Sequence, residues 1–387
     1  MKHGLRSAGF TLLTLLLVGL SFAAGYLYRD RQAQAFYFPI LEEVYRAVEL
    51  RGLKDLPDRT QMEYGLIRGF LQAYDDPYTV FLEPPQNELE SNRLEGRYGG
   101  IGAEIKLGPD GWLLYPFPDS PAAKAGLQEG DRLLAIEGQA VGPQTASDTV
   151  LAGLRGPVGS LARLSVGRAP DYRALELQIE RAEIPLPSVT YRLDSQDARM
   201  GVVQVNWIAA TTANEIQAAF EALQQRGATL FALDLRNNPG GLLDAGVNIA
   251  RLFLKDGIVM HQQYRGRPVD IFKVEQPGPL ADAPLVVLIN QGSASAAEIA
   301  AGALQAQRRA RLIGEPSYGK DTIQLVIGLQ DGSSLHVTSA HWWIPGLEGQ
   351  AGNGLQPDYL ALPVDPANPS AGDPYLRLAL DVLLGRL

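Results

Sequence analysis

The sequence predicts an α/β protein with an open sheet, preceded along the chain by a small β-rich domain, a helical region and an apolar N-terminal segment. From residue 183 onward, apolar strand-like segments alternate with amphipathic helices, which is typical of an open-sheet α/β domain. Residues 92–182 contain short alternating strands between Gly-rich turns. Residues 32–86 repeat apolar side chains at helical spacing. A chain of 387 residues is long enough for two or three such domains.

The composition excludes several classes of function. A net charge of −9 argues against a nucleic-acid partner, because no basic stripe is present to neutralise phosphates. The absence of cysteine excludes disulfides, thiol catalysis and cysteine-based zinc sites. The 4 histidines do not form any spacing known for metal binding. We therefore expect neither a metal nor another cofactor.

Residues 1–30 have the character of a targeting or anchoring segment. Lys2 and Arg6 precede an uncharged run from Ser7 to Tyr28, which as a helix would span about 33 Å, close to the roughly 30 Å of a hydrocarbon core. The positive flank places the N-terminus in the cytoplasm and the rest of the chain in the cell envelope, outside the cytoplasm. We favour an uncleaved membrane anchor. A signal peptide cleaved after the small residues near Ala23 is the alternative.

Residues 31–91 form the predicted helical region. Leu41, Val44, Tyr45 and Val48 recur at helical spacing, and the pattern predicts two or three packed helices without chemistry of their own. Asp76-Pro77 ends this region.

The β-rich segment, 92–182, begins with the alternating run Y-G-G-I-G-A-E-I-K-L. In the following run D-S-P-A-A-K-A-G-L, Ser120 is a natural N-cap, Pro121 fits the first helical position and Gly126 is a candidate C-cap. The segments Leu161–Arg168 and Ala174–Glu180 are expected to pair as strands.

In the α/β segment, 183–365, the pattern predicts an ordered series of strands and helices. The expected strands are 201–205, 230–235, 284–290 and 311–314, and the expected helices are 212–225, 243–254 and 295–307. Residues 366–387 should hold a C-terminal helix, Tyr375–Leu384, that packs on this core.

Ser295 stands at the start of a predicted helix. Together with Glu298 it forms the pattern of a capping box, which satisfies two backbone donors at a helix N-terminus. A serine in this position also lies in a positive local field, and the N–H of Ala296 is free to face a developing oxyanion. Both interpretations are compatible with the sequence.

Lys320 lies in a Gly-bounded turn, with Gln324 four residues further on. A lysine is usually a solvated surface charge, and as a general base it must lose a proton that it normally holds to a pKa of about 10.4. Burial lowers that pKa, and Gln324 could orient the amine. On a straight strand the two Cα atoms would lie about 13 Å apart, so a bend is required.

Three further patterns could carry chemistry. The Gly-rich turn that contains Gly240 and Gly241 follows a buried strand, and its N–H groups could complete an oxyanion hole or merely lead into a helix. Ser317-x-x-Lys320 matches the S-x-x-K motif of penicillin-binding proteins, but Pro316 and Gly319 disfavour the helix that this motif needs, and no K-T-G follows. A Ser–His–Asp triad would have to use His336 or His341, and the sequence supports this hypothesis less than it supports S-x-x-K.

Four blocks stand in the order of one known family: L-D-L-R-N-N-P-G-G-L, G-S-A-S-A-A-E-I, G-E-P-S-Y-G-K-D-T-I-Q and G-L-Q-P-D. From about residue 36 to 363 the chain resembles the carboxyl-terminal processing, or tail-specific, proteases. These are Ser–Lys peptidases with a PDZ domain, which residues 92–182 resemble. Ser295 and Lys320 are 25 positions apart, the interval of this family, which selects Ser295 over Ser293 as the nucleophile. The resemblance implies a crotonase-like or ClpP-like open-sheet protease core with the PDZ domain inserted.

By this resemblance the chain is a serine endopeptidase that recognises apolar C-terminal tails of envelope proteins. Ser295 would attack the scissile carbonyl, Lys320 would be the general base and Gln324 would orient the lysine. The oxyanion hole would come from Gly240 or Gly241 and from Ala296. A homo-oligomer is compatible with this assignment. The PDZ domain would bind the tail through one loop and one arginine: Tyr98, Gly99, Gly100, Ile101, Gly102 and Arg155.

The chain departs from the family pattern at several positions. Asp321 replaces the usual glycine after the lysine, and a carboxylate there would oppose the lowering of the lysine pKa. Ala297 replaces a common serine, and the segment His341–Gly346 replaces a more usual Tyr-Thr-Pro-Ser-Gly run. The alternative function is therefore a PDZ adaptor with a catalytically silent protease domain.

Overall fold

The computed structural model describes residues 17, 20–21, 38–348, 352–361 and 372–387. Most of the predicted N-terminal anchor lies outside these residues. Among the helices that are described, none combines the length and the apolar character needed to cross a membrane. The chain divides into two units, Met1–Ala73 and Tyr74–Leu387, and each is described by itself.

The first unit contains two helices, α2 (Pro39–Arg51) and α3 (Arg59–Tyr74). Both were predicted, but neither buries a side chain, so the expected packing of helices is not found within the described part of this unit. Gly52 ends α2 in an extended conformation, and apolar residues such as Val44 and Val48 stay exposed.

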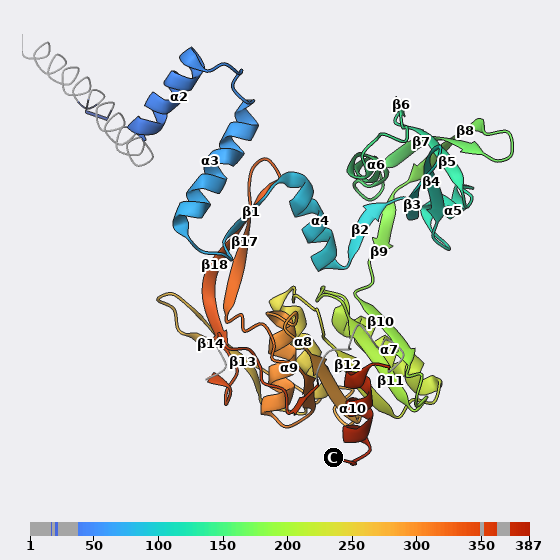
Figure 1. Cartoon of the computed structure of the whole chain (residues 1–387), viewed down its shortest axis with the longest axis vertical. Coiled ribbons are helices and arrows are strands. Elements are labelled where there is room, and N and C mark those ends of the chain that lie inside the picture. Colours follow the sequence, from blue (N-terminus) through green and yellow to red (C-terminus); the bar gives the residue numbers. More distant parts are fainter. Residues whose placement is uncertain (1–16, 18–19, 22–37, 349–351, 362–371) are drawn as a thin grey trace, which may run out of the picture. The chain divides into compact units, whose positions relative to one another are not determined.

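The second unit is built around the predicted open sheet (Figure 1). Its order is β10-β11-β12-β15-β16-β19; β10 runs antiparallel to β11, and the remaining neighbours are parallel. The strand bounds agree with the predicted ones to within a residue or two where a strand was predicted. The strands are β10 (Val189–Leu193), β11 (Met200–Val205), β12 (Leu230–Asp234), β15 (Leu285–Ile289), β16 (Arg311–Gly314) and β19 (Tyr359–Leu360).

Helices cover both faces of this sheet, which explains why its central strands are continuously apolar. In β12, Phe231 and Leu233 pack in the cluster formed with α7–α9, whereas Ala232 packs in the cluster formed with α10. The C-terminal helix therefore packs on the core, as predicted. The helices are α7 (Thr212–Gln225), α8 (Leu243–Phe253), α9 (Ala296–Ala306) and α10 (Pro374–Leu383).

A second sheet, which the sequence analysis did not predict, joins distant parts of the chain. It has the order β1-β18-β13-β14, and β17 pairs with the other edge of β18. Strand β1 precedes the small β-domain in sequence, yet its Val80 lies opposite His336 of β18. The strands are β1 (Val80–Leu82), β13 (Ile258–Tyr264), β14 (Val269–Lys273), β17 (Thr322–Gly328) and β18 (Ser334–Trp343).

The small β-domain is an insertion that the chain enters through β2 (Arg97–Gly100) and leaves through β9 (Ala182–Pro185), two strands that pair antiparallel. Helix α4 (Pro84–Glu95) extends past the predicted boundary at residue 92 and ends where Gly96 takes a φ of 73°. The remaining elements of this domain are β3 (Ala103–Gly108), β4 (Gly111–Pro116), α5 (Pro121–Lys124), β5 (Asp131–Ile136), β6 (Gln139–Ala140), α6 (Ser147–Leu154), β7 (Leu161–Arg168) and β8 (Arg173–Glu180).

Local predictions for this domain are confirmed. The Ser120 hydroxyl accepts a hydrogen bond from the N–H of Ala123 at 3.1 Å, with Pro121 as the first helical residue. Gly126 follows the short helix α5 with a φ of 87°. Strands β7 and β8 pair along their whole length. Helix α6 was not predicted.

Candidate active site

Ser295 lies between β15 and α9, at the N-terminus of the helix. Its φ of 57° and ψ of −120° are unusual for a residue with a side chain, and such a conformation persists only where the surroundings enforce it. Gly240 approaches closely: a Cβ atom there would lie 2.8 Å from the carbonyl oxygen of Ala294 and 2.9 Å from Cβ of Ser295. The Gly-rich turn and the serine loop are therefore packed backbone to backbone.

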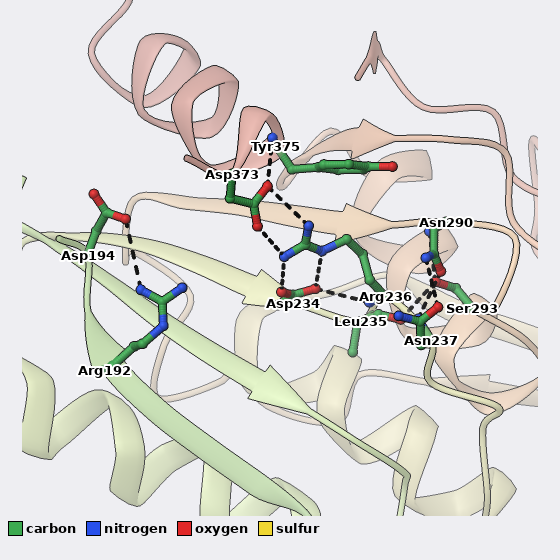
Figure 2. Close-up of polar contacts among 10 residues, drawn as sticks. All are labelled: Arg192, Asp194, Asp234, Leu235, Arg236, Asn237, Asn290, Ser293, Asp373 and Tyr375. Atoms are coloured by element: carbon green, nitrogen blue, oxygen red, sulfur yellow. Dashed lines mark hydrogen bonds and ion pairs between the residues drawn. The ribbon is translucent and has the colours of Figure 1, made fainter. Parts of the chain in front are cut away.

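The two loops are joined by a network of hydrogen bonds, shown in Figure 2. The Asn237 N–H donates to Asn290 Oδ1 at 2.8 Å, and Asn290 Nδ2 donates back to Asn237 Oδ1 at 2.9 Å. The buried Ser293 hydroxyl donates to the carbonyl of Leu235 at 2.7 Å and accepts from the N–H of Asn290. Ser293 thus fastens the loops together, which leaves Ser295 as the serine of this loop open to the cavity.

The Gly-rich turn is also held from the opposite side of the sheet. Figure 2 shows the guanidinium of Arg236 between two carboxylates: it donates to Asp234 at 2.9 and 2.6 Å and to Asp373 at 3.2 and 2.8 Å. Asp373 is the N-cap of α10, and the ring of Tyr375 lies 4.6 Å from the guanidinium. The C-terminal helix is therefore tied to the residue next to the Asn237 turn. Asp234 and Arg236 both lie in the L-D-L-R block, but the sequence pattern alone indicates no role for them.

The candidate oxyanion donors differ in availability. The N–H of Gly240 donates to Asn238 Oδ1 at 2.8 Å and is therefore occupied. Within the described part of the chain, the N–H groups of Gly241 and Ala296 make no hydrogen bond. Of the two glycines considered, Gly241 is thus the one with a free donor.

Lys320 precedes β17, and its amine donates to Gln324 Oε1 at 2.5 Å. The required bend is present, because Lys320 lies in the loop before Thr322 and the register of β17 shifts between Ile323 and Gln324. Burial lowers the pKa of Lys320, whereas the charges of Glu298 and Asp76 raise it and so oppose the effect.

Asp321, the departure expected to oppose a neutral lysine, is not one of the charges that raise the pKa of Lys320. Its carboxylate lies 3.8 Å from Nδ1 of the exposed His341, and its side chain is 38% exposed. The carboxylates that raise the pKa of Lys320 are Glu298 and Asp76 instead.

Glu298 connects the serine to the lysine. One oxygen of its buried carboxylate accepts from the N–H of Ser295 at 2.8 Å and from the N–H of Lys320 at 3.1 Å. The other oxygen accepts from the Ser317 hydroxyl at 2.5 Å and from the N–H of Gly319 at 2.7 Å. The predicted capping residue thus has a second partner, the lysine loop, which the sequence analysis did not foresee.

The rival serine is placed unfavourably for chemistry. Ser317 is buried, its hydroxyl donates to Glu298, and it accepts the N–H of Leu355 at 2.7 Å. The residues from Ser317 to Lys320 form a loop rather than the helical turn that S-x-x-K requires. Both histidines considered for a triad lack a hydrogen bond to Ser295 in the described residues; His336 lines the same cavity and burial lowers its pKa.

Ser295, Lys320 and Gln324 line one cavity of about 380 Å³. Its other walls combine apolar side chains with the polar groups of Tyr78, Glu90 and His336, and the apolar part suits a peptide with apolar side chains. From the segment that departs from the family pattern, Trp342 reaches this cavity; Ala297 is buried in the core. The apolar lining includes Leu94, Leu242, Leu243, Ile299, Ile323, Val326 and Trp342. Among the described residues no cluster of potential metal ligands is present.

The predicted tail-binding residues of the small β-domain also lie together. Tyr98, Gly99 and Gly100 belong to β2, whereas Ile101 is buried and Gly102 turns the chain into β3 with a φ of 75°. Gly100 also pairs with Arg155, whose guanidinium lies 4.8 Å from the ring of Tyr98.

The open-sheet core, the inserted β-domain and the serine at a helix start define a hydrolase of the PDZ-containing kind. Residues 199–361 match Peptidase family S41, and residues 116–168 match a PDZ domain. The chain is 36% identical over 339 residues to a carboxyl-terminal-processing protease of Picosynechococcus sp., covering 84% of this chain and 80% of that protein. A protein of the same name from Synechocystis sp. is 36% identical over 333 residues, covering 83% and 77%. The chain therefore belongs to the carboxyl-terminal-processing serine proteases of family S41.

A solved structure is similar as well. The photosystem II D1 C-terminal processing protease shares 31% sequence identity, with 82% of this chain and 86% of that chain covered and a TM-score of 0.45. The family models and the curated relatives confirm the family, the PDZ domain and the serine-protease class that the sequence predicts.

Proposed function

We propose that this protein cleaves other proteins near their C-termini by Ser–Lys chemistry. The observation that carries the proposal is the placement of Lys320: its half-buried amine is held by Gln324 and lines the same cavity as Ser295. Burial favours the neutral amine, which is the form that can accept a proton.

In the acylation step, the lone pair of Lys320 Nζ takes the hydroxyl proton of Ser295 while Oγ bonds to the scissile carbonyl carbon. The carbonyl π electrons move onto oxygen, and the N–H groups of Gly241 and Ala296 would stabilise that oxyanion. Collapse of the tetrahedral intermediate breaks the C–N bond, and the ammonium of Lys320 returns its proton to the leaving amine.

In the deacylation step, Lys320 takes a proton from water, whose oxygen bonds to the acyl carbon. The proton then returns to Ser295 Oγ as the acyl–oxygen bond breaks, and the new C-terminal carboxylic acid leaves and ionises in solvent. Gln324 keeps the amine directed through both steps, because its Oε1 accepts one of the amine protons.

Tail recognition is assigned to the PDZ domain. A C-terminal carboxylate would bind backbone N–H groups of the loop from Tyr98 to Gly102, with Arg155 beside it, while the tail adds as a strand. The N-terminal segment would anchor the enzyme on the extracytoplasmic face of a membrane, where envelope proteins are its substrates.

A cleavage assay tests the proposal. The full chain is incubated with an unfolded protein that carries an apolar C-terminal tail, and the products are read by mass spectrometry. We expect cleavage by the wild type and by Ser317→Ala, and none by Ser295→Ala or Lys320→Ala. Cleavage lost only in Ser317→Ala would overturn the assignment of the nucleophile. Tail binding without any cleavage by the wild type would indicate an adaptor.

A further inference from the structure

One aromatic side chain in the catalytic cavity has no part in the mechanism above. The Tyr78 ring lies over the amine of Lys320, with its centroid 4.9 Å from Nζ, and Tyr78 lines the cavity together with Ser295. The sequence pattern of the segment that contains Tyr78 predicts helices without chemistry of their own.

The backbone on both sides of Tyr78 is fixed, so the ring is held in place. The Tyr78 N–H donates to Asp76 Oδ1 at 3.1 Å, and the Thr79 hydroxyl donates to Asp76 Oδ2 at 2.5 Å. The same Thr79 hydroxyl accepts the N–H of Thr338 at 3.2 Å, and β1 continues the pairing with β18 from Val80. The Asp76 turn is thereby attached to the strand next to β17, which follows Lys320.

The phenol hydroxyl is held as well. Tyr78 donates to the hydroxyl of Tyr318 at 3.4 Å, and Tyr318 lies two residues before Lys320. This hydrogen bond, together with burial and the nearby charges of Asp321 and Glu298, raises the pKa of Tyr78 to about 12, so the phenol is neutral at physiological pH. A neutral ring presents its π face to the amine without adding a charge.

We propose that Tyr78 is a positioning residue for the catalytic lysine: its ring shields the amine from water before proton transfer, and its π face holds the ammonium that proton transfer creates. The proposal rests on the proposed function of Lys320 as the general base. Tyr78 lies outside the four sequence blocks that carry the resemblance to the family.

The two effects of the ring act in opposite directions on the lysine. Water exclusion disfavours the ammonium, by up to several pKa units for a fully buried group. A cation–π contact favours the ammonium and raises the lysine pKa by less than about one unit. The ring therefore keeps the resting amine neutral while limiting the penalty of charging it. Other charged or titratable groups also act on the site. The carboxylates of Glu298 and Asp76 raise the pKa of the lysine, Glu90 and His336 line the same cavity, and the charge of Asp321 acts on Tyr78.

The test measures the titration of Lys320 directly. The full chain is treated briefly with acetic anhydride across a range of pH, and acetylation of Lys320 is quantified by mass spectrometry, because only the neutral amine reacts. Tyr78→Phe keeps the ring and should leave the midpoint within about 0.2 units. Tyr78→Leu keeps the apolar cover but lacks the π face, so its midpoint should fall by about half a unit. Tyr78→Ala admits water, and its midpoint should rise by about one unit.

The opposite shifts of the leucine and alanine variants separate this role from a merely structural one. Unchanged midpoints in both variants, or a rise in Tyr78→Leu, would overturn the proposal. If Tyr78→Ala does not fold, as judged by circular dichroism, the comparison of leucine with phenylalanine still decides. The same titration in Ser295→Ala does not depend on catalysis. If the predicted midpoint shifts are found in Ser295→Ala but the wild type cleaves nothing, the proposed function is contradicted. The effect of the Tyr78 ring on the amine would still be supported.

Discussion

The carboxylate oxygen Oε2 of Glu298 lies 2.8 Å from the backbone nitrogen of Ser295. The same oxygen accepts the N–H of Lys320 at 3.1 Å, so one buried side chain fixes the backbone of both the nucleophile and the base. Burial raises the pKa of Glu298, while the hydrogen bonds that it accepts lower it. The hydrogen bonds that its two carboxylate oxygens accept, rather than its charge alone, hold the site together.

Replacing this carboxylate by an amide should damage both stability and catalysis. In Glu298→Gln one oxygen becomes an NH₂ group, which cannot accept the two bonds that the oxygen accepted. We expect a loss of about 1–3 kcal/mol in the free energy of unfolding, measured by urea denaturation. We also expect kcat/KM for a tail peptide to fall about a hundredfold, because the serine and the lysine lose their common support. Wild-type kcat/KM in this variant would show that Glu298 is only a helix cap.

The stability of the enzyme should depend on pH through Lys320. Below the lowered pKa, the ammonium is charged in both the folded and the unfolded states, and burial destabilises the folded one. As pH rises towards about 10.4, the folded lysine loses its proton while the unfolded lysine keeps it, so this penalty disappears. The stability of the wild type should therefore increase relative to Lys320→Met as pH rises from 6 to 10.

Lys320→Arg is the matched control for this titration, because arginine stays charged over the whole range. Its stability relative to Lys320→Met should show no such increase. Urea unfolding of the three proteins at several pH values provides the comparison. A constant difference between wild type and Lys320→Met would contradict burial of the charge.

The open-sheet core could be predicted because its signals are local. Leu285–Ile289 is a short continuous apolar run, and helices with regular apolar spacing follow such strands. The second sheet was missed because its pairing joins β1 to β18 across most of the chain, and half-exposed strands such as β17 lack a clear alternation. Long-range pairing of this kind leaves no period in the sequence.

Only the part of the candidate site that depends on local sequence could be predicted. The interval between Ser295 and Lys320 can be counted in the sequence. The contacts of Glu298 with the lysine loop depend instead on how α9 packs against that loop. The approach of Tyr78 to Lys320 depends on β1 pairing with β18. The role of Arg236 likewise depends on α10 folding back against the sheet.

The tie between α10 and Arg236 should stabilise the protein. In Asp373→Asn the partly buried guanidinium loses a charged acceptor, and we expect a loss of about 1–2 kcal/mol by urea denaturation. Cleavage should also slow by several-fold, because Arg236 adjoins the Asn237 turn. Arg192 supplies the control: its guanidinium is 56% exposed and lies 4.0 Å from Asp194, so Arg192→Gln should change stability by less than about 0.5 kcal/mol. Equal effects of the two changes would argue against the tie.

The close approach of the two catalytic loops should not tolerate a side chain at Gly240. A Cβ atom there would lie 2.8 Å from the backbone oxygen of Ala294, and the φ of 94° is itself unfavourable for alanine. Gly266 has a similar φ of 71° but open space around it, so Gly266→Ala isolates the backbone strain, which is about 1 kcal/mol. We expect Gly240→Ala to be less stable than Gly266→Ala in urea, and to lose reactivity of Ser295 towards a fluorophosphonate reagent while Gly266→Ala keeps it. Full reactivity of Gly240→Ala would mean that the Gly-rich turn can move away from Ser295 without consequence, and that it does not shape the oxyanion site.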